Sequence, residues 1–388
     1  MRSAAAPRSL VAADCVSGWQ SAVVSTTPVW DDQPRPPTPR LDHDLTTDVC
    51  VIGLGGSGLT ALHVLRDHDV RAIGVDAGLI AAGAAGRNGG FLLAGLARPH
   101  HRVVEQLGRE TAGRLHQLTL DEIDRITKTT PDAVRRTGSL RIEDEAAGRA
   151  DCVRQREALL ANGFAVLDYD GPEGRGLLLS DDGVLQPVRR CVELAAGLEV
   201  FENSPVMAIE SNRVETPGGT IRCEQVLVTV DGRLEQLLPE LSGRVRTVRL
   251  QMLATAPTAV LTSRAVYLRD GYDYYQQLPD GRLAAGGCRD LAALQEETSD
   301  AEPTAPVQQG IERFLRERLR VTAPVTHRWA ASVGYTDDGL PYVGEVRPGV
   351  WAAGGYCGTG NVVGALCARA IALAAIGQDG SRYWPLLS

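Results

Sequence analysis

Lysine is almost absent from this sequence of 388 residues. Lys128 is the only lysine among 40 basic residues, so a catalytic lysine amine is restricted to one position. The net charge of −8 argues against a nucleic-acid partner, whose binding surface would be basic. No apolar run approaches the roughly 18 residues of a membrane span, and the first residues lack the apolar core of a secretory signal. We therefore expect neither a membrane segment nor a nucleic-acid partner.

Metal-binding and disulfide patterns are missing as well. The cysteines at positions 15, 50, 152, 191, 223, 288, 357 and 367 form no C-x-x-C motif and have no metal-ligand spacing. Several lie in apolar segments, where a free cysteine acts as a small hydrophobic residue. These features predict a reduced, cytoplasmic protein without a metal. The composition gives no indication of the oligomeric state.

The clearest motif lies in residues 46–90. A short apolar run at residues 49–52 is typical of a buried parallel strand. Gly53, Gly55 and Gly58 follow as G-x-G-x-x-G, and an apolar-faced helix comes next. A second strand, residues 70–75, ends at Asp76, where a dinucleotide site needs an acid for a ribose diol. Gly53 would form the tight turn, Gly55 would let the backbone approach a pyrophosphate, and Gly58 would let the helix pack closely. This order predicts a dinucleotide site.

The rest of the chain contains an irregular N-terminal segment and further predicted strands and a helix. Residues 1–40 have no periodicity and are proline-rich at 31–40, so we expect an extended arm, held by Trp19 and Trp30. Strands are expected at 200–210 and 220–230, and the apolar run 225–230 should return to the parallel sheet. Short alternating segments at 246–255, 265–268, 272–278 and 282–287, with a Pro-Asp-Gly turn at 279–281, predict antiparallel sheet. A glycine-rich turn at 354–360 precedes an alanine-rich helix, 362–376, with no second acid-tipped strand. We therefore predict no separate NAD(P) domain.

With these residues assembled, the chain resembles the D-amino-acid-oxidase-like family of FAD-dependent amine and amino-acid oxidoreductases. The resemblance spans about residues 41–377 and rests on TTDVCVIGLGGSGL, AAGRNGGF, YDYYQQLPDGRLAAGG, and GYTDDGLPYVG with GGYCGTGNVVG. The γ-glutamylputrescine oxidoreductase-like branch is the most similar. The family implies an α/β fold, with a Rossmann-like FAD-binding domain built from discontinuous segments and an inserted antiparallel-sheet substrate domain. On this basis we expect an N-terminal arm at 1–40, the FAD-binding domain at 41–136, 183–240 and 326–388, and the substrate domain at 137–182 and 241–325.

The same resemblance implies the cofactor-binding residues. They are Gly53, Gly55, Gly56, Ser57 and Gly58 at the pyrophosphate, Asp76, Ala77 and Val206 toward the adenosine, Ala85, Gly86, Arg87, Asn88, Gly89 and Gly90 along the flavin, and Gly232, Gly355, Tyr356, Gly358, Thr359, Gly360 and Asn361 completing the site. A helix N-terminus at the last group would stabilise negative charge on the reduced ring. Family members often read SGRNGGQ in the second motif. Here Ala85 replaces the hydroxyl residue and Phe91 the amide, so weaker FAD binding and altered flavin surroundings are expected.

The chemistry implied by the family is oxidation of a substrate amine to an imine that hydrolyses. FAD carries the difficult step, so no acid–base pair is required, and the protein chiefly orients the substrate. Our catalytic candidates are Tyr274, Tyr275, Cys357 and Arg282, with Tyr272 and Tyr335 also possible on the substrate face. The alternative for each tyrosine is ordinary cross-strand packing. His327 is interpreted as structural.

The substrate class follows from what is missing. Family members of the glycine-oxidase type clamp a substrate carboxylate with two arginines, at positions that match Val333 and Cys357 here. Unless Arg289 or Arg249 supplies the clamp, a primary or secondary amine, polyamine-derived or N-substituted, is expected. An amino-acid oxidase, a non-catalytic FAD-binding subunit and an NAD(P)-dependent dehydrogenase are the alternatives.

Two features of the flavin chemistry stay open. The sarcosine-oxidase branch activates oxygen with a lysine near the flavin. Lys128 lies outside the expected substrate sheet, so Arg282 is a possible substitute, and the acceptor is oxygen or another molecule. Cys288 and Cys357 are conceivable points of covalent attachment, but buried free thiols and non-covalent FAD are favoured.

Overall fold

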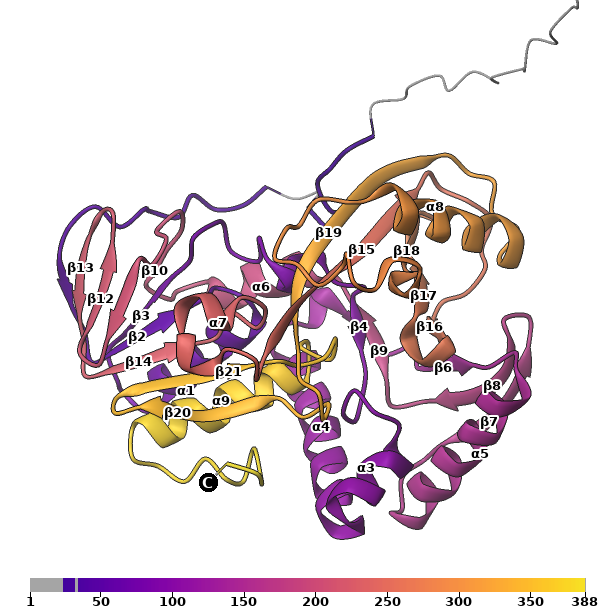
Figure 1. The fold of residues 1–388 in the computed structure, drawn as a ribbon, viewed down its shortest axis with the longest axis horizontal. Coiled ribbons are helices and arrows are strands. Elements are labelled where there is room, and N and C mark those ends of the chain that lie inside the picture. The colour runs from indigo at the N-terminus through magenta and orange to yellow at the C-terminus, as the bar shows by residue number, and fades with distance from the viewer. Residues whose placement is uncertain (1–23, 32–33, 388) are drawn as a thin grey trace, which may run out of the picture.

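The computed structural model describes residues 24–31 and 34–387. Two sheets dominate the fold, and they lie side by side in Figure 1. We call them the parallel sheet and the antiparallel sheet. Mixed α/β architecture with two distinct sheets agrees with the fold class that the sequence predicted.

The parallel sheet contains the predicted dinucleotide unit. Its order is β10 (Val200–Phe201), β3 (Ala72–Val75), β2 (Val49–Ile52), β14 (Gln225–Val228), β21 (Val350–Gly354) and β20 (Tyr342–Arg347). All neighbours are parallel except β20, which pairs antiparallel with β21. The predicted return of residues 225–230 is confirmed, since β14 lies between β2 and β21. Every residue of β2 is buried, as the apolar run requires.

Two helices cover one face of this sheet (Figure 1). They are α1 (Gly56–Asp67) and α9 (Val363–Ala375), which pack on each other. The interface consists largely of alanine, leucine and valine, including Leu59, Leu62 and Ile371. Small side chains on α9 let the two helices approach closely, which brings both N-termini to the same edge of the sheet.

The antiparallel sheet contains the predicted hairpin. Its order is β19 (Val325–Tyr335), β15 (Arg246–Thr255), β18 (Leu283–Gly287), β17 (Asp273–Gln277), β16 (Ala265–Leu268), β6 (Ser139–Ile142), β8 (Gly174–Leu179) and β7 (Leu167–Gly171). Among the strand pairs of this sheet in the part of the chain that the structure describes, only β16–β6 is parallel. The four strands expected between residues 246 and 287 are all present within one residue of the expected bounds. Helix α8 (Ala305–Arg313) and the short π-helix that follows it, Phe314–Arg318, cover one face.

Two expected boundaries differ from the structure. We assigned residues 326–335 to the FAD-binding domain, but β19 pairs with β15 from Arg246 to Thr255 and so belongs to the antiparallel sheet. Residues 200–210 do not form one strand. β10 ends at Phe201, and Asn203 adopts a left-handed conformation, with φ of 51°. The chain then continues as β11 (Ala208–Glu210) in another sheet.

Smaller elements complete the fold. One small sheet has the order β1 (Leu45–Thr46), β13 (Gly219–Arg222), β12 (Arg213–Thr216) and β11, and the other has β4 (Phe91–Leu92), β9 (Gly183–Leu185) and β5 (Val134–Arg135). The remaining helices are α2 (Ala84–Arg87), α3 (His100–Leu107), α4 (Arg109–Thr129), α5 (Ala146–Ala161), α6 (Pro187–Ala195) and α7 (Leu234–Leu237). None of the helices in the described ranges is long and apolar enough to cross a membrane.

The N-terminal arm is anchored by a tryptophan. The Trp30 side chain is 2% exposed, and its Nε1 donates to the Asn88 carbonyl at 2.8 Å. This contact confirms the expectation for Trp30, whereas Trp19 lies outside the described residues. The arm thereby contacts the glycine-rich segment that follows β3.

Candidate functional site

A cavity of about 870 Å³ lies between the two sheets. The ends of β2, β3 and β14 contribute its lining from the parallel sheet, and β15, β17 and β19 contribute from the other. The carboxyl ends of parallel strands are where open α/β sheets bind ligands. The cavity therefore joins the predicted dinucleotide site to the predicted substrate sheet.

The glycine-rich turn has the geometry of a dinucleotide cradle. Gly53 has φ of 104°, a conformation that favours glycine. A Cβ added to Gly58 would lie 1.9 Å from the Gly53 carbonyl oxygen, so α1 packs directly on the turn. This confirms the packing task predicted for Gly58. The first backbone N–H groups of α1 have no acceptor within the helix and face the end of the cavity lined by Gly55, Gly56 and Ser57.

Asp76 lies where the ribose acid was expected. It borders the cavity at the end of β3, and its carboxylate accepts hydrogen bonds from the Leu54 and Gly78 backbone N–H groups at 2.7 and 2.9 Å. Burial raises the pKa of Asp76 above its ordinary value. The two N–H groups fix the carboxylate beside the turn, so a ribose diol would meet an oriented acceptor.

Polar side chains in the second motif hold the loop rather than face outward. The Arg87 guanidinium donates to the carbonyls of Ala82 and Ala330 at 3.0 and 3.1 Å. Asn88 Oδ1 accepts from Gly90 N at 2.7 Å and from Asn361 Nδ2 at 3.1 Å. The indole N–H of Trp30 donates to the Asn88 carbonyl, and that of Trp329 donates to the Arg87 carbonyl. These contacts tie the arm, β19 and the start of α9 to the cavity wall.

Asp231, which our site prediction did not include, joins three segments at the opposite wall. Its Oδ1 accepts from Gly355 N and Tyr356 N at 3.0 and 3.1 Å, and its Oδ2 accepts from Gly334 N at 3.1 Å. Burial raises the pKa of Asp231 to about 6. The Asp-Gly pair at the end of a buried strand was the available sequence signal. The three backbone partners come from positions more than 100 residues away, so only the structure shows this role.

Most predicted cofactor residues border the cavity. Those that do are Gly53, Gly55, Gly56, Ser57, Asp76, Ala77, Ala85, Arg87, Asn88, Gly89, Val206, Gly232, Tyr356, Gly358, Thr359, Gly360 and Asn361. Four glycines lie behind the lining. An added Cβ would contact backbone carbonyls at Gly58, Gly86 and Gly90, and Gly355 donates to Asp231. These four allow close packing of the wall rather than forming its surface.

The structure separates the two tyrosines that the sequence placed together. Tyr274 borders the cavity, and its Cε2 is 3.2 Å from where a Cβ on Gly89 would lie. Tyr275 is 2% exposed on the other face, with its ring 6.1 Å from that of Phe314. Successive side chains of a strand point to opposite faces, so only one of the pair can face the cavity. The prediction that Tyr275 contacts substrate is therefore wrong.

Arg282 also lies away from the cavity. It pairs with Asp280 within the hairpin turn between β17 and β18, and it does not border the cavity. The hairpin carries this residue to the end of the strand pair, so it cannot substitute there for an oxygen-activating lysine. Lys128 is exposed near the end of α4 and outside the antiparallel sheet, as the sequence suggested.

Cys357 and Tyr335 lie together at the glycine-rich turn before α9. Both border the cavity, and Tyr335 Oη is 3.7 Å from where a Cβ on Gly358 would lie. Burial raises the pKa of the Cys357 thiol above its ordinary value and that of Tyr335 to about 12. Cys288 is buried outside the lining, and its thiol pKa is raised to about 12. All three groups are therefore protonated near neutral pH.

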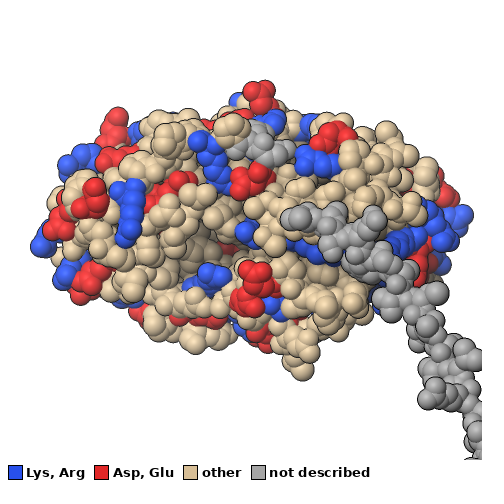
Figure 2. All heavy atoms as spheres, turned by 90° about the horizontal axis from the view of Figure 1, so that it is seen from above, with Lys and Arg blue, Asp and Glu red and all other residues tan. Residues whose placement is uncertain are grey.

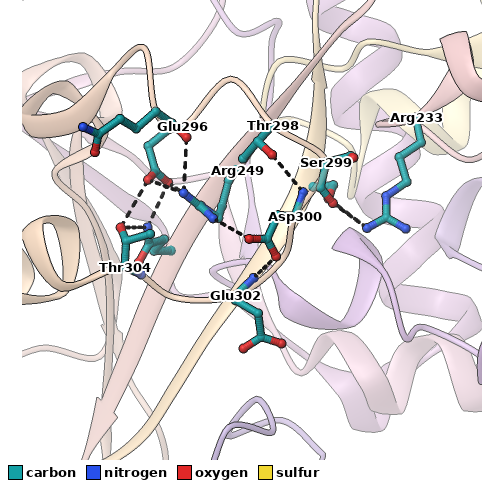
Figure 3. Close-up of polar contacts among 11 residues, drawn as sticks. Arg233, Arg249, Glu296, Thr298, Ser299, Asp300, Glu302 and Thr304 are labelled. Atoms are coloured by element: carbon teal, nitrogen blue, oxygen red, sulfur yellow. Dashed lines mark hydrogen bonds and ion pairs between the residues drawn. The ribbon is translucent and has the colours of Figure 1, made fainter.

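The two arginines considered for a carboxylate clamp have different surroundings. Arg249 is 5% exposed and pairs with the fully buried Glu296 at 2.9 Å (Figure 3). Arg289 is stacked between two rings, 5.0 Å from the Tyr335 centroid and 5.7 Å from that of Tyr272. The Arg249 guanidinium is therefore occupied by its buried ion pair with Glu296, whereas Arg289 lies beside Tyr335, a tyrosine of the cavity.

A loop between β18 and α8 covers part of the cavity. Figure 3 shows Arg249 and Arg233 contacting this loop, and the Arg233 guanidinium donates to the Ser299 carbonyl at 2.6 Å. Ala301 and Glu302 of the loop border the cavity. The polar composition of residues 296–306 did not reveal this position.

The cavity extends beyond Tyr274 to a polar end that sequence reasoning missed. Arg141 borders it from β6, is buried, and pairs with Asp151 at 2.8 Å and Asp270 at 2.5 Å. Gln155 and Tyr267 lie in the same region. An arginine between Leu140 and Ile142 in a strand was the only sequence signal. It indicates that the sheet face opposite the core is polar.

The donor set fits a flavin dinucleotide. Helix N–H groups and small residues occur where a diphosphate would lie, an oriented carboxylate where a ribose would lie, and a flat wall of glycine backbone between α2 and Tyr274. A cavity of about 870 Å³ is large enough for a ligand of this class. Ala85 and Phe91 both border it, so the two departures from the usual motif face the ligand.

Comparisons with known proteins agree with this geometry. Over 381 residues the chain is 27% identical to a probable oxidoreductase OrdL of Rhizobium meliloti, covering 89% of this chain and 86% of the relative. It is 25% identical to the γ-glutamylputrescine oxidoreductase of Escherichia coli, covering 87% and 85%. The fold matches the L-proline dehydrogenase of P. horikoshii with a TM-score of 0.71 and 16% identity, over 88% of this chain and 98% of that one. The glycine oxidase of Geobacillus kaustophilus matches with a TM-score of 0.70 and 19% identity, over 86% and 96%.

The family comparison covers most of the chain. Residues 48–374 match the DAO family, described as FAD dependent oxidoreductase. The resemblance seen in the motifs is thereby confirmed, and FAD is the cofactor of the predicted dinucleotide site. The chain belongs to the DAO family of FAD-dependent oxidoreductases.

Proposed function

We propose that the enzyme oxidises a primary or secondary amine, polyamine-derived or N-substituted, to an imine. The glycine turn before α1 and Asp76 would hold FAD, which would supply the two-electron oxidation of the carbon beside nitrogen and the route for those electrons to oxygen or another acceptor. The amine nitrogen loses one proton to water, and hydrolysis of the imine yields a carbonyl compound and an amine or ammonia.

One observation carries the proposal. Val333 and Cys357, which match the positions of the family's carboxylate-binding arginines, both border the cavity. The substrate end is therefore lined there by an apolar side chain and a protonated thiol. An amine without an α-carboxylate fits this wall without leaving a buried anion unpaired. The similarity to γ-glutamylputrescine oxidoreductase, named for an amine substrate, supports this class.

The side chains around the substrate position orient rather than exchange protons. Burial raises the pKa of Tyr274 above its ordinary value, and the pKa of Tyr335 is also raised. Both phenols therefore remain hydrogen-bond donors at neutral pH. The Tyr274 ring also packs against Phe91, with centroids 5.8 Å apart, which fixes its direction. The substrate would bind as the neutral amine, held by these rings over the glycine wall.

A second candidate is an amino-acid oxidase, and Arg289 is the observation that favours it. Its guanidinium is stacked on Tyr335, and the described residues include no ion-pair partner for it. A guanidinium held by its faces keeps its N–H edges available for a carboxylate. The Arg289→Gln variant separates the two functions, because it should abolish turnover of an α-amino acid and leave turnover of a simple amine largely intact.

The first experiment is a visible spectrum of the purified protein, repeated on the supernatant after acid precipitation. Flavin in the supernatant would agree with the non-covalent FAD that we propose, whereas colour in the pellet would show a covalent link. Anaerobic bleaching is then followed with diamines and N-substituted amines, and separately with glycine and D-amino acids. Bleaching by amines supports the proposal. Bleaching by amino acids alone would replace it with the second candidate, and bound flavin that no substrate bleaches would indicate a non-catalytic subunit.

We also infer a cytoplasmic location and a small-molecule substrate. The seven described cysteines are free, as expected in a reducing compartment. The face in Figure 2 intersperses acidic and basic side chains, without the basic patch expected of a nucleic-acid site. Cell fractionation tests the location.

A further inference from the structure

Arg190 is a buried arginine behind the dinucleotide turn. It lies on α6, is 3% exposed, and extends toward α1. Its Nη1 is 2.5 Å from where a Cβ on Gly56 would lie. Gly56 borders the cavity at the N-terminus of α1. The thickness of one glycine therefore separates the guanidinium from the cavity.

Arg190 has no partner in the described part of the chain. None of the described ion pairs or hydrogen bonds involves its side chain, and its Nε is buried without an acceptor. Glu122 is a nearby carboxylate, but it is already bonded to Arg369 at 2.9 Å and to Arg125 at 3.2 Å. A buried cation without a counter-charge is strongly unfavourable, so the folded protein should supply one.

The lining of the cavity indicates where a negative charge that pairs with Arg190 would lie. The end of the cavity next to Arg190 is the N-terminus of α1, where helix N–H groups attract an anion. A diphosphate bound there would lie on the other side of Gly56 from the guanidinium. Charges only a few ångströms apart in a dry interior interact far more strongly than in water. A side chain at position 56 would occupy the space that Arg190 Nη1 now approaches.

We propose that Arg190 is the counter-ion of the FAD diphosphate, and that Gly56 is small so that the guanidinium can approach it. The arginine completes its own ion pair only when the cofactor binds. The inference depends on the FAD cofactor and not on the amine substrate, so it holds whichever substrate is oxidised.

The test compares FAD binding and apoprotein stability in the Arg190→Met variant. Methionine keeps apolar volume and removes the charge. The Kd of the apoprotein for FAD, from quenching of flavin fluorescence, should rise roughly ten- to a hundred-fold, the range of a charge-assisted hydrogen bond. The Kd for riboflavin, which lacks phosphate, should be unchanged. The apoprotein should also melt at a higher temperature than the wild type, because an unpaired buried charge has been removed.

Three further variants complete the design. Arg190→Lys retains the charge and should bind FAD more tightly than Arg190→Met. Gly56→Ala would displace the guanidinium and should weaken FAD binding while riboflavin binding persists. Arg66→Met, at an arginine with a half-exposed side chain near the other end of α1, is the matched control and should bind FAD as the wild type does.

Three results would overturn the proposal. Unchanged FAD affinity in Arg190→Met would show that the guanidinium does not interact with the diphosphate. Equal weakening of FAD and riboflavin binding, with a less stable apoprotein, would show that Arg190 supports only the packing of α6 on α1. An Arg190→Met chain that fails to fold would likewise count against it, since removal of an unpaired charge should stabilise the apoprotein.

Discussion

The covering loop offers a direct measurement of what a buried ion pair contributes to this fold. Glu296 is fully buried and accepts from Arg249 Nε and Nη2 at 3.0 and 2.9 Å (Figure 3). It also accepts from Gln251 Nε2 at 2.9 Å. The next residue, Glu297, pairs with Arg246 at 2.8 Å, but both side chains are nearly half exposed. Two adjacent glutamates thus pair with two arginines of β15, and the Glu296 pair is buried whereas the Glu297 pair is exposed.

The Glu296→Gln substitution keeps the shape of the side chain and removes its charge. Arg249 would then be buried with Asp300, an exposed carboxylate at 3.3 Å, as its remaining counter-ion. Breaking a buried pair from one side costs about 3–5 kcal/mol, and we expect about 3 kcal/mol because Asp300 remains. The Glu297→Gln substitution should cost less than about 1 kcal/mol, because water already screens that pair.

Urea unfolding of the wild type and both variants, followed by tryptophan fluorescence, measures the difference. High salt should reduce the effect of Glu297→Gln and leave that of Glu296→Gln largely unchanged. Equal losses in the two variants would refute the reasoning, since they would mean that burial does not set the strength of these pairs. A more stable Glu296→Gln chain would show that desolvation of the glutamate outweighs its three hydrogen bonds with Arg249 and Gln251.

Three other predictions concern the cavity and side chains buried outside its lining. Gly58→Ala should lose FAD affinity and destabilise the fold by about 1–3 kcal/mol, because its Cβ would overlap backbone. Gly344→Ala lies outside the cavity lining, and its Cβ would meet only Tyr342 Oη at 3.9 Å, so it should be near neutral in FAD titration and thermal melting. Asp182 is a buried carboxyl group that accepts hydrogen bonds from Ser139 Oγ at 2.6 Å and Ala94 N at 2.7 Å. Burial raises its pKa to about 7, so its stabilising contribution is present below about pH 4 and is lost as the pH rises through 7. Asp182→Asn should therefore be more stable than the wild type at pH 8, and the difference should shrink toward pH 4; a constant difference would contradict the assignment. Tyr274→Phe should raise KM for the substrate without lowering thermal stability. Tyr275→Ala should lower the stability by about 3–5 kcal/mol and leave KM unchanged. The reverse pattern would mean that the two faces of β17 are misassigned.

The dinucleotide unit could be predicted because its signals are local. The apolar strand at residues 49–52, the three glycines and the acid at Asp76 each impose one backbone requirement within about 30 residues. The hairpin between β17 and β18 was predictable for the same reason, since Pro-Asp-Gly selects a tight turn. In both cases short-range sterics determine the structure before any tertiary contact forms.

The composition of the cavity wall depended on contacts that sequence patterns do not contain. Alternation along a strand shows that Tyr274 and Tyr275 face opposite ways, but the packing of α8 decides which face is covered. Whether Arg249 or Arg289 is available depends on Glu296, which a loop brings to β15. The partners of Asp231 and the proximity of Arg190 to Gly56 join residues more than 100 positions apart.

The sequence by itself determined the dinucleotide fold, the family and the cofactor, because glycine turns, strand periodicity and motif order are local and directional. Only the tertiary structure decided which side chains border the cavity and which carry the packing. A residue's burial and its charge partner depend on which distant segments fold against it, and these contacts fix both the free energy of a buried group and the chemistry left to it.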